Sequence, residues 1–229
     1  MRLAFKNPLI TFTNLFFTVN LKNGQRVYDK INMNDNGNLS YPESRLMDDH
    51  LFLPMYSAYF LTKYSKNEGA TNTFDGNYPW FTYPDENFFS DAPAGGVKEA
   101  DCLRTIYFGG FLTMTIGGQM VMREIPGIDM LYRPGRPFAS TAGSGEASPV
   151  QQEWGPGAKM QGYHRLENDI VLKGKQDNKL TVSLGSGDVT NLEGGNDNAN
   201  LGNKLIVAFK GLLYYGETSA QKGFCNLPG

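Results

Sequence analysis

Two histidines, His50 and His164, are the first residues to consider for chemistry, because a histidine beside a nucleophile is a common sign of hydrolytic activity. Neither lies in a stretch that resembles a nucleophile elbow. His50 follows Asp48 and Asp49, and this string has metal-binding atoms, but a single such string is more typical of a solvated polar turn. His164 and Arg165 are typical of a surface or packing pair. We predict no catalytic residue and no metal ligand here.

The glycine-rich stretches do not form a nucleotide-binding motif. No G-x-x-x-x-G-K-[ST] sequence occurs, and no G-x-G-x-x-G sequence follows an expected strand. The Gly-Ser-Gly stretches at 143–145 and 185–187 are typical of flexible turns. Carboxylates are numerous, but their spacing in the sequence cannot show that any two face each other, as a glycosidase requires. We therefore predict a protein that is not an enzyme and binds no cofactor.

The stretch from Asn32 to Glu43, NMNDNGNLSYPE, is close to the calcium loop of an EF-hand. Gly37 stands where that loop turns sharply, and Glu43 stands where a carboxylate binds calcium with both oxygens. The early ligand positions 32, 34 and 36 all hold asparagine, which is neutral. Because calcium affinity falls with the charge of the ligands, the sequence favours an Asn-rich turn over a calcium site.

The two cysteines, Cys102 and Cys225, are too far apart in sequence to show a metal-ligand or redox spacing. A disulfide and two unpaired thiols both remain open, and the thiols are favoured for a protein made in a cytoplasm. The amino terminus supports that location, because Lys6 and Pro8 interrupt its apolar residues and leave no signal-peptide core. No run approaches the roughly 18 apolar residues of a membrane-spanning helix.

The composition favours a folded β protein. Of the 229 residues, 40% are hydrophobic and 19% are charged, which excludes an intrinsically disordered chain. The net charge of −2 argues against a protein that coats nucleic acid mainly by electrostatics. The many glycines, phenylalanines and tyrosines suit strands joined by tight turns better than long helices.

Alternating apolar residues predict a series of strands. The alternation is clearest in two segments at opposite ends of the chain, 9–21 and 204–215. Gly117-Gly118 predicts a hairpin, and 97–103 predicts one or two helical turns. The other expected strands are 51–64 with a break or an edge near Pro54, 104–116 with a bulge or close backbone approach at Gly109-Gly110, 119–125, 168–172 and 179–184.

Two long connections separate these strands, at about 65–96 and 132–163. The first holds many aromatic residues, which are costly to expose, so we expect it to fold back on the domain or to meet a partner. No amphipathic helix of ten or more residues alternates with the strands, which disfavours a parallel α/β sheet. We predict one domain over 1–229, an antiparallel β-sandwich of jelly-roll type with long irregular loops.

The carboxyl-terminal third resembles the closing strands of jelly-roll structural proteins of viruses. The resemblance is carried by HRLENDIVLKGKQDNKLTVSL and, after a loop, NKLIVAFKGLLYYG with its Lys210-Gly211 step; GGFLTMTIGGQMVMREIPG fits a hairpin of the same fold. The family is that of tailless bacteriophages of the PRD1–adenovirus lineage and their single-jelly-roll relatives. The resemblance implies a subunit of a virion shell, either capsid or vertex protein, that assembles through loops and termini.

Such a subunit has other copies of itself and other capsid proteins as partners. Its amino-terminal arm, residues 1–8 with Arg2 and Lys6, could reach an internal membrane or a genome, although a frayed terminus explains it equally well. The alternative function is a carbohydrate-binding or adhesin-like sandwich, in which Trp80 and Trp154 would stack on sugars. The missing export signal argues against that alternative.

Overall fold

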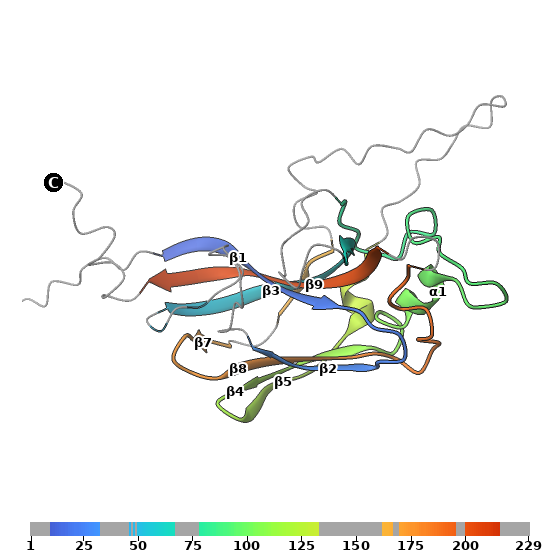
Figure 1. Ribbon diagram of the computed structural model, residues 1–229. Coiled ribbons are helices and arrows are strands. Elements are labelled where there is room, and N and C mark those ends of the chain that lie inside the picture. Colours follow the sequence, from blue (N-terminus) through green and yellow to red (C-terminus); the bar gives the residue numbers. More distant parts are fainter. Residues whose placement is uncertain are drawn as a thin grey trace, which may run out of the picture.

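The structure, a computed structural model, describes residues 10–32, 46, 48, 50–66, 78–132, 162–166, 170–195 and 200–215. Two antiparallel sheets pack face to face, and Figure 1 shows them as an upper and a lower layer. The strands are β1 (Ile10–Asn20), β2 (Val27–Asn32), β3 (His50–Ser65), β4 (Phe111–Ile116), β5 (Gln119–Pro126), β6 (His164–Arg165), β7 (Leu172–Lys173), β8 (Asn178–Ser183) and β9 (Leu201–Tyr215). The predicted all-β antiparallel sandwich is confirmed.

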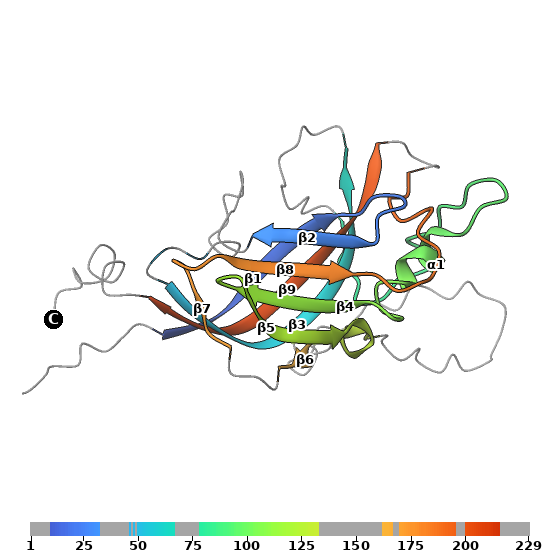
Figure 2. The same cartoon turned by 90° about the horizontal axis from the view of Figure 1, so that it is seen from below.

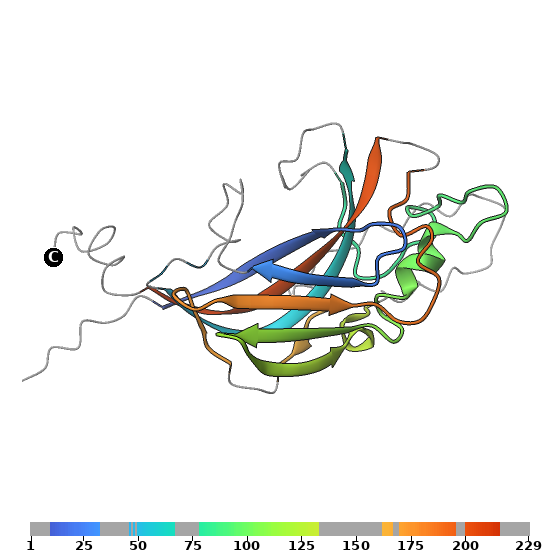
Figure 3. The ribbon, with the colours of Figure 1, turned by 60° about the horizontal axis from the view of Figure 1, so that its bottom comes forward.

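The upper layer, here called the long sheet, has the strand order β1-β9-β3-β6, with β7 also paired to β3. The lower layer, the short sheet, has the order β2-β8-β4-β5, which Figure 2 shows from below. The apolar side chains between the two sheets form one core to which all the long strands contribute. Helix α1 (Glu99–Arg104) lies at one end of the sandwich, beside the loop that leads to β9 (Figure 3). No helix among the described residues has the length and apolar character needed to cross a membrane.

The chain pairs with itself as a nested set of antiparallel strand pairs. The β4–β5 hairpin is innermost, β3 pairs with β6 and β7, β2 pairs with β8, and β1 pairs with β9 outermost. Two further pairings, β3 with β9 and β4 with β8, join these pairs into the two sheets. Successive strands consequently change layer, except within the β4–β5 hairpin and between β6 and β7.

The alternation in the first and last strands is confirmed. Leu15, Phe17 and Val19 of β1 are buried against the short sheet, and the residues between them are less buried. Strand β9 differs in one respect, since Ile206 and Ala208 on its outer face are as fully buried as its inward-facing residues. This central strand is therefore covered on both faces, as apolar runs in the middle of a sheet usually are.

The break expected near Pro54 is a bulge inside β3. The register with β9 shifts between Pro54 and Tyr56, and Pro54 lies opposite Gly211. A side chain at Gly211 would put its Cβ only 2.0 Å from the carbonyl oxygen of Leu53. The Lys210-Gly211 step of the sequence therefore has a physical reason, which is the close approach of the two backbones at this bulge.

The strand predicted over 104–116 is wrong in its first half. Helical hydrogen bonds continue beyond α1, and the N–H of Phe108 still bonds the carbonyl of Arg104 at 2.9 Å. Gly109 then adopts a left-handed φ of 80° and ends this helical segment, so that the strand starts at Phe111. The predicted close approach occurs at Gly110, where a Cβ would lie 2.3 Å from the Ile106 carbonyl oxygen.

The remaining predicted elements are largely confirmed. The hairpin at Gly117-Gly118 has positive φ at both glycines, and α1 fills most of the segment expected to be helical. The strand expected at 179–184 corresponds to β8. The strand expected at 168–172 is confirmed only at Leu172, the first residue of the two-residue β7, since Ile170 and Val171 are not in a strand. β7 and β8 belong to different sheets, so their polar turn carries the chain between layers. Residues 167–169 lie outside the described part of the chain, as does most of the loop at 132–163.

The described part of the aromatic loop folds back on the domain, as predicted. Phe81 forms a β-bridge with Leu61, with two backbone hydrogen bonds of 2.7 and 2.9 Å. Its ring packs against Phe88 and Phe89, at centroid distances of 4.8 and 5.8 Å. Trp80 packs against the outer face of the long sheet, between the rings of Phe16 and Phe60.

The contact at Gly211 gives a test of the fold. We expect Gly211→Ala to lower the free energy of unfolding by about 3 kcal/mol or more, because the clash is with backbone that cannot move aside without separating β3 from β9. Urea unfolding followed by circular dichroism measures the change. Gly24→Ala is the control, since its φ of 76° costs about 1–2 kcal/mol but no atom lies within 4 Å of the new Cβ. Equal losses in the two variants would contradict the close approach.

Candidate functional site

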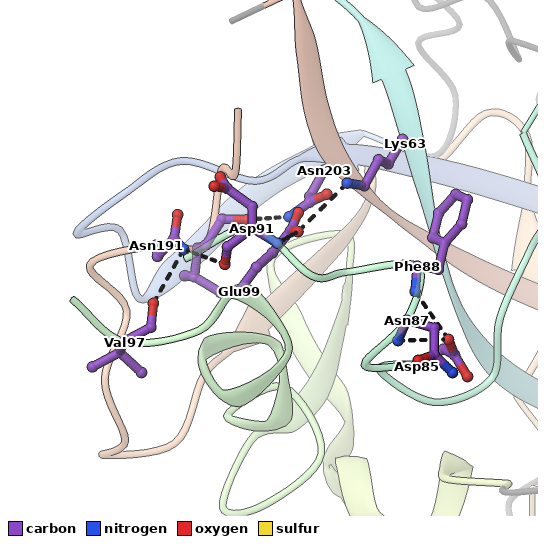
Figure 4. Close-up of polar contacts among 10 residues, drawn as sticks. Lys63, Asp85, Asn87, Phe88, Asp91, Val97, Glu99, Asn191 and Asn203 are labelled. Carbon is purple, nitrogen blue, oxygen red and sulfur yellow. Dashed lines mark hydrogen bonds and ion pairs between the residues drawn. The ribbon is translucent and has the colours of Figure 1, made fainter. Parts of the chain in front are cut away.

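Three polar side chains from distant parts of the chain meet at the end of the core nearest α1. Lys63 lies near the end of β3, Asn203 near the start of β9, and Glu99 is the first residue of α1. Lys63 and Asn203 are direct partners in the antiparallel pairing of β3 with β9. Figure 4 shows the three side chains together. We call them the Lys63–Glu99–Asn203 cluster.

Glu99 is at the centre of this cluster, and its side chain is completely buried. Its Oε2 accepts a hydrogen bond from Lys63 Nζ at 3.4 Å and another from the backbone N–H of Asp91 at 3.2 Å. Oε1 is buried with no hydrogen-bond partner, and so is Oδ1 of Asn203. Buried polar atoms without partners are costly, so these two oxygens reduce what the cluster contributes to stability.

Burial dominates the electrostatics of Glu99 and raises the pKa of its carboxyl group. The positive charge of Lys63, the Asn203 amide and the Asp91 N–H lower that pKa, but together they do not offset burial. The Asn203 amide acts here by proximity, since its geometry falls short of a hydrogen bond to Oε1. A buried carboxyl group with a raised pKa holds its proton more readily than one in water and can pass it to a neighbour.

The loop before β9 shapes the site. The side-chain N–H₂ of Asn191 donates to the carbonyls of Asp91 and Val97, both at 3.1 Å, and so ties this loop to the segment before α1. Gly194 has a φ of 66°, and a Cβ there would lie 2.4 Å from Oε1 of Glu99. The backbone of the loop therefore lies directly against the carboxyl group and excludes water from it.

Two aromatic rings cover the Lys63 side of the cluster. Lys63 Nζ lies 5.5 Å from the ring centroid of Phe88 and 5.8 Å from that of Phe89. Asp85 holds this turn in place, because its Oδ1 accepts the backbone N–H groups of Asn87 and Phe88, both at 3.0 Å. The side chain of Lys63 is only 15% exposed as a result.

The residues considered from the sequence lie elsewhere. His50, at the start of β3, packs edge to face against Tyr215. His164 lies in β6 and is the pairing partner of Ser57 in the middle of β3, so the two histidines lie at different points along that strand. Within the described residues, no group of three or more His, Cys, Asp or Glu side chains could hold a metal ion. The possible calcium loop after Asn32 and the second tryptophan, Trp154, lie outside the described residues.

Cys102 is a buried free thiol, while Cys225 is outside the described residues. Burial raises the pKa of the Cys102 thiol, and its Sγ lies 3.9 Å from Oδ1 of Asp188. A thiol with a raised pKa is a poor nucleophile, so its chemistry does not compete with that of the cluster.

None of the three cluster residues was predicted from the sequence, although one signal for them was present. The side chains of Leu61 in β3 and Leu205 in β9 face inward. The next inward position toward the α1 end is Lys63 in β3 and Asn203 in β9. A polar residue at an inward position of a strand indicates a paired or functional group. The pairing register, which the sequence does not define, is what brings the two residues together.

Comparison of the chain with protein-family models, with curated proteins and with solved structures finds no match. The function is therefore inferred from the strand order, the sheet edges and the side-chain chemistry of the described residues.

The raised pKa of Glu99 predicts how stability depends on pH. A carboxyl group whose pKa is higher in the folded than in the unfolded protein stabilises the fold at low pH, and that contribution is lost as pH rises from about 4.5 through the folded pKa. We expect Glu99→Gln to remove this loss. Unfolding free energies across this pH range measure the effect, and parallel pH profiles for the two proteins would contradict the prediction.

Proposed function

We propose that the chain is a jelly-roll structural subunit of a virion shell, which assembles with other copies of itself. The strand order carries the proposal. A jelly roll has eight strands in nested antiparallel pairs, which wrap into two four-stranded sheets. The sheet orders β1-β9-β3-β6 and β2-β8-β4-β5 fit this pattern if β6 and β7 count as one strand position. Viral capsid proteins and lectins both use this fold.

A shell subunit needs a surface that binds another copy, and the outer edge of β1 suits that task. This strand runs for 11 residues, ITFTNLFFTVN, with no charged residue and no proline. Its other edge pairs with β9 along its whole length. Ile10 and Phe12 near its start are 54% and 51% exposed. A long, uncharged strand edge readily adds another strand.

The other sheet edges carry features that discourage such pairing. The free side of β3 is covered by short segments, which are β7, β6 and the Phe81 bridge. In the short sheet, β2 is brief, shifts register and exposes Asp29. At the opposite edge, β5 contains register shifts and a strained Glu124 with a φ of 32°. Bulges, charges and short strands are how β proteins protect their edges, and among the described strands the edge of β1 lacks all three.

A second copy is the occupant that this edge fits best. Two β1 strands related by a two-fold axis would pair antiparallel, and the same surface on each subunit would meet itself. The absence of charge removes like-charge repulsion between the copies. Pairing of even-numbered with even-numbered residues keeps inward side chains inward, so the long sheet would continue across both subunits.

The carbohydrate-binding alternative has less support among the described residues. A sugar-stacking platform needs a free aromatic face, whereas Trp80 is half-buried and packs against Phe16 at 5.5 Å and Phe60 at 5.7 Å. These contacts place Trp80 in the covering of the long sheet. The expected contacts through the loop after Tyr132 and through the termini stay predictions, since those segments lie outside the described residues.

Light scattering coupled to size-exclusion chromatography tests the proposal. We expect the protein to form dimers or larger assemblies, and Ile10→Lys with Phe12→Lys to raise the dissociation constant about tenfold or more, because a charge on the edge must be desolvated when strands pair. Phe108→Lys is the matched control, since Phe108 is equally exposed at 54% but lies beside α1, away from β1.

Electron microscopy of the same samples shows whether the assemblies form closed shells or sheets of subunits. A protein that stays monomeric at high concentration and binds an array of glycans would overturn the proposal in favour of the carbohydrate-binding reading. Equal weakening by the β1 variant and the Phe108 variant would reject the β1 edge as the contact.

A further inference from the structure

The pairing of Lys63 with Asn203 is of the closer of the two antiparallel types. The backbone N–H of Asn203 bonds the carbonyl of Glu193 at 3.0 Å, and its carbonyl accepts the N–H of Leu21 at 2.9 Å. In an antiparallel ladder both groups of a residue point to the same side, and here that side faces away from β3. Lys63 and Asn203 therefore form a non-hydrogen-bonded pair, in which the Cα atoms are about 4.5 Å apart and the side chains are closest.

Glu99 completes a reactive arrangement around this pair. Its carboxyl group contacts Lys63 Nζ at 3.4 Å through Oε2. Oε1 lies on the side of Asn203, because a Cβ on Gly194 would lie 2.4 Å from Oε1 and 3.1 Å from Asn203 Nδ2. One carboxyl group thus stands between an amine and a carboxamide, with each of its oxygens turned toward one of them.

We propose that Lys63 and Asn203 join through an amide bond between their side chains within the folded protein, with Glu99 as the proton carrier. The amine nitrogen attacks Cγ of Asn203, the Nζ–Cγ bond forms, and the Cγ–Nδ2 bond breaks to release ammonia. Of the three protons on the Lys63 ammonium, one remains on the new amide, one leaves with ammonia and one stays on Glu99. No oxidant, cofactor or added reagent is needed.

The surroundings of the cluster favour this reaction over hydrolysis or no reaction. Transfer of a proton from Lys63 to Glu99 converts a buried ion pair into a neutral amine and a neutral acid, which removes the cost of burying two charges. The rings of Phe88 and Phe89 flank the Lys63 amine, and the backbone at Gly194 lies against Asn203, which is only 1% exposed, so little water reaches the carboxamide. The fixed strand register already holds the amine and the carboxamide close together. The reaction therefore avoids the entropy cost of bringing the two groups together, which is a large part of the activation barrier in solution.

The bond would cross-link β3 to β9 near the end of their pairing. These strands come from opposite halves of the sequence, so the link closes a loop of more than half the chain. Like a disulfide, it lowers the conformational entropy of the unfolded chain. Unlike a disulfide, it does not break in a reducing compartment. In an assembly that pairs through β1, such a link would hold together the long sheet, which forms the contact between subunits.

Mass spectrometry of the purified, folded protein tests the inference directly. We expect an intact mass about 17 Da below that of the sequence, from the loss of ammonia, and a branched tryptic peptide that joins Lys63 to Asn203. An intact mass equal to that of the sequence, with both residues recovered unmodified in the peptide map, would overturn the proposal. This measurement needs no variant and does not depend on whether the protein assembles into shells.

Variants separate the roles of the three residues. Lys63→Met and Asn203→Ala should abolish the mass loss, and Glu99→Gln should slow it about a hundredfold or more, since it removes the proton carrier. Asn203→Asp should lose about 18 Da instead, because a carboxyl group releases water when it forms the amide. Lys66→Met is the matched control: Lys66 pairs with Glu193 at 2.7 Å nearby, and this variant should keep the full loss. Retention of the mass loss by folded Glu99→Gln, judged by circular dichroism, would remove Glu99 from the mechanism.

Discussion

The pairing of β3 with β9 is the constraint on which the rest of the structure depends. It runs from His50 opposite Tyr215 to Ser65 opposite Leu201 and joins segments separated by more than half the chain. Strand β1 can pair only once β9 is in place, and the short segments β6 and β7 pair only with β3. Loop closure makes such distant pairing entropically costly, so burial along it must be extensive. The complete burial of Ile206, Val207 and Ala208, on both faces of β9, meets that need.

Strands in which apolar and polar residues alternate clearly could be predicted from the sequence. Segments whose apolar spacing fits both a strand and a helix could not. Leu15, Phe17 and Val19 alternate with less buried residues because one face of β1 packs on the core, and this period is visible without a structure. Ile106 and Phe108 show the same spacing by coincidence. They lie in the helical segment after α1, where one is fully buried and the other is exposed. Only Gly109-Gly110 marked that boundary, and a glycine pair is equally consistent with a bulge.

The candidate site was harder to predict, because it is made by register rather than by a motif. Lys63, Glu99 and Asn203 share no local pattern, and the residues that do resemble motifs, such as His50 with its two aspartates, take no part in it. An inward-facing lysine in an apolar strand was the available signal. Its partner depends on which residue of β9 lies opposite, and a shift of one residue would turn Asn203 to the other face. The burial of the inward-facing residues along both strands, such as Leu61 opposite Leu205, specifies that register.

A buried ion pair is poor evidence of a stabilising role, since apolar residues of similar volume often stabilise a core better. Here the pair occurs with two further costs, which are an unpartnered oxygen on Glu99 and another on Asn203. All three destabilising groups lie where β3 pairs with β9, the pairing on which the other strands of the long sheet depend. A core that tolerates them at this place needs a compensating gain. A covalent bond between the two strands supplies it, because the bond removes the lysine charge, leaves Glu99 protonated beside the new amide, and holds the pairing shut.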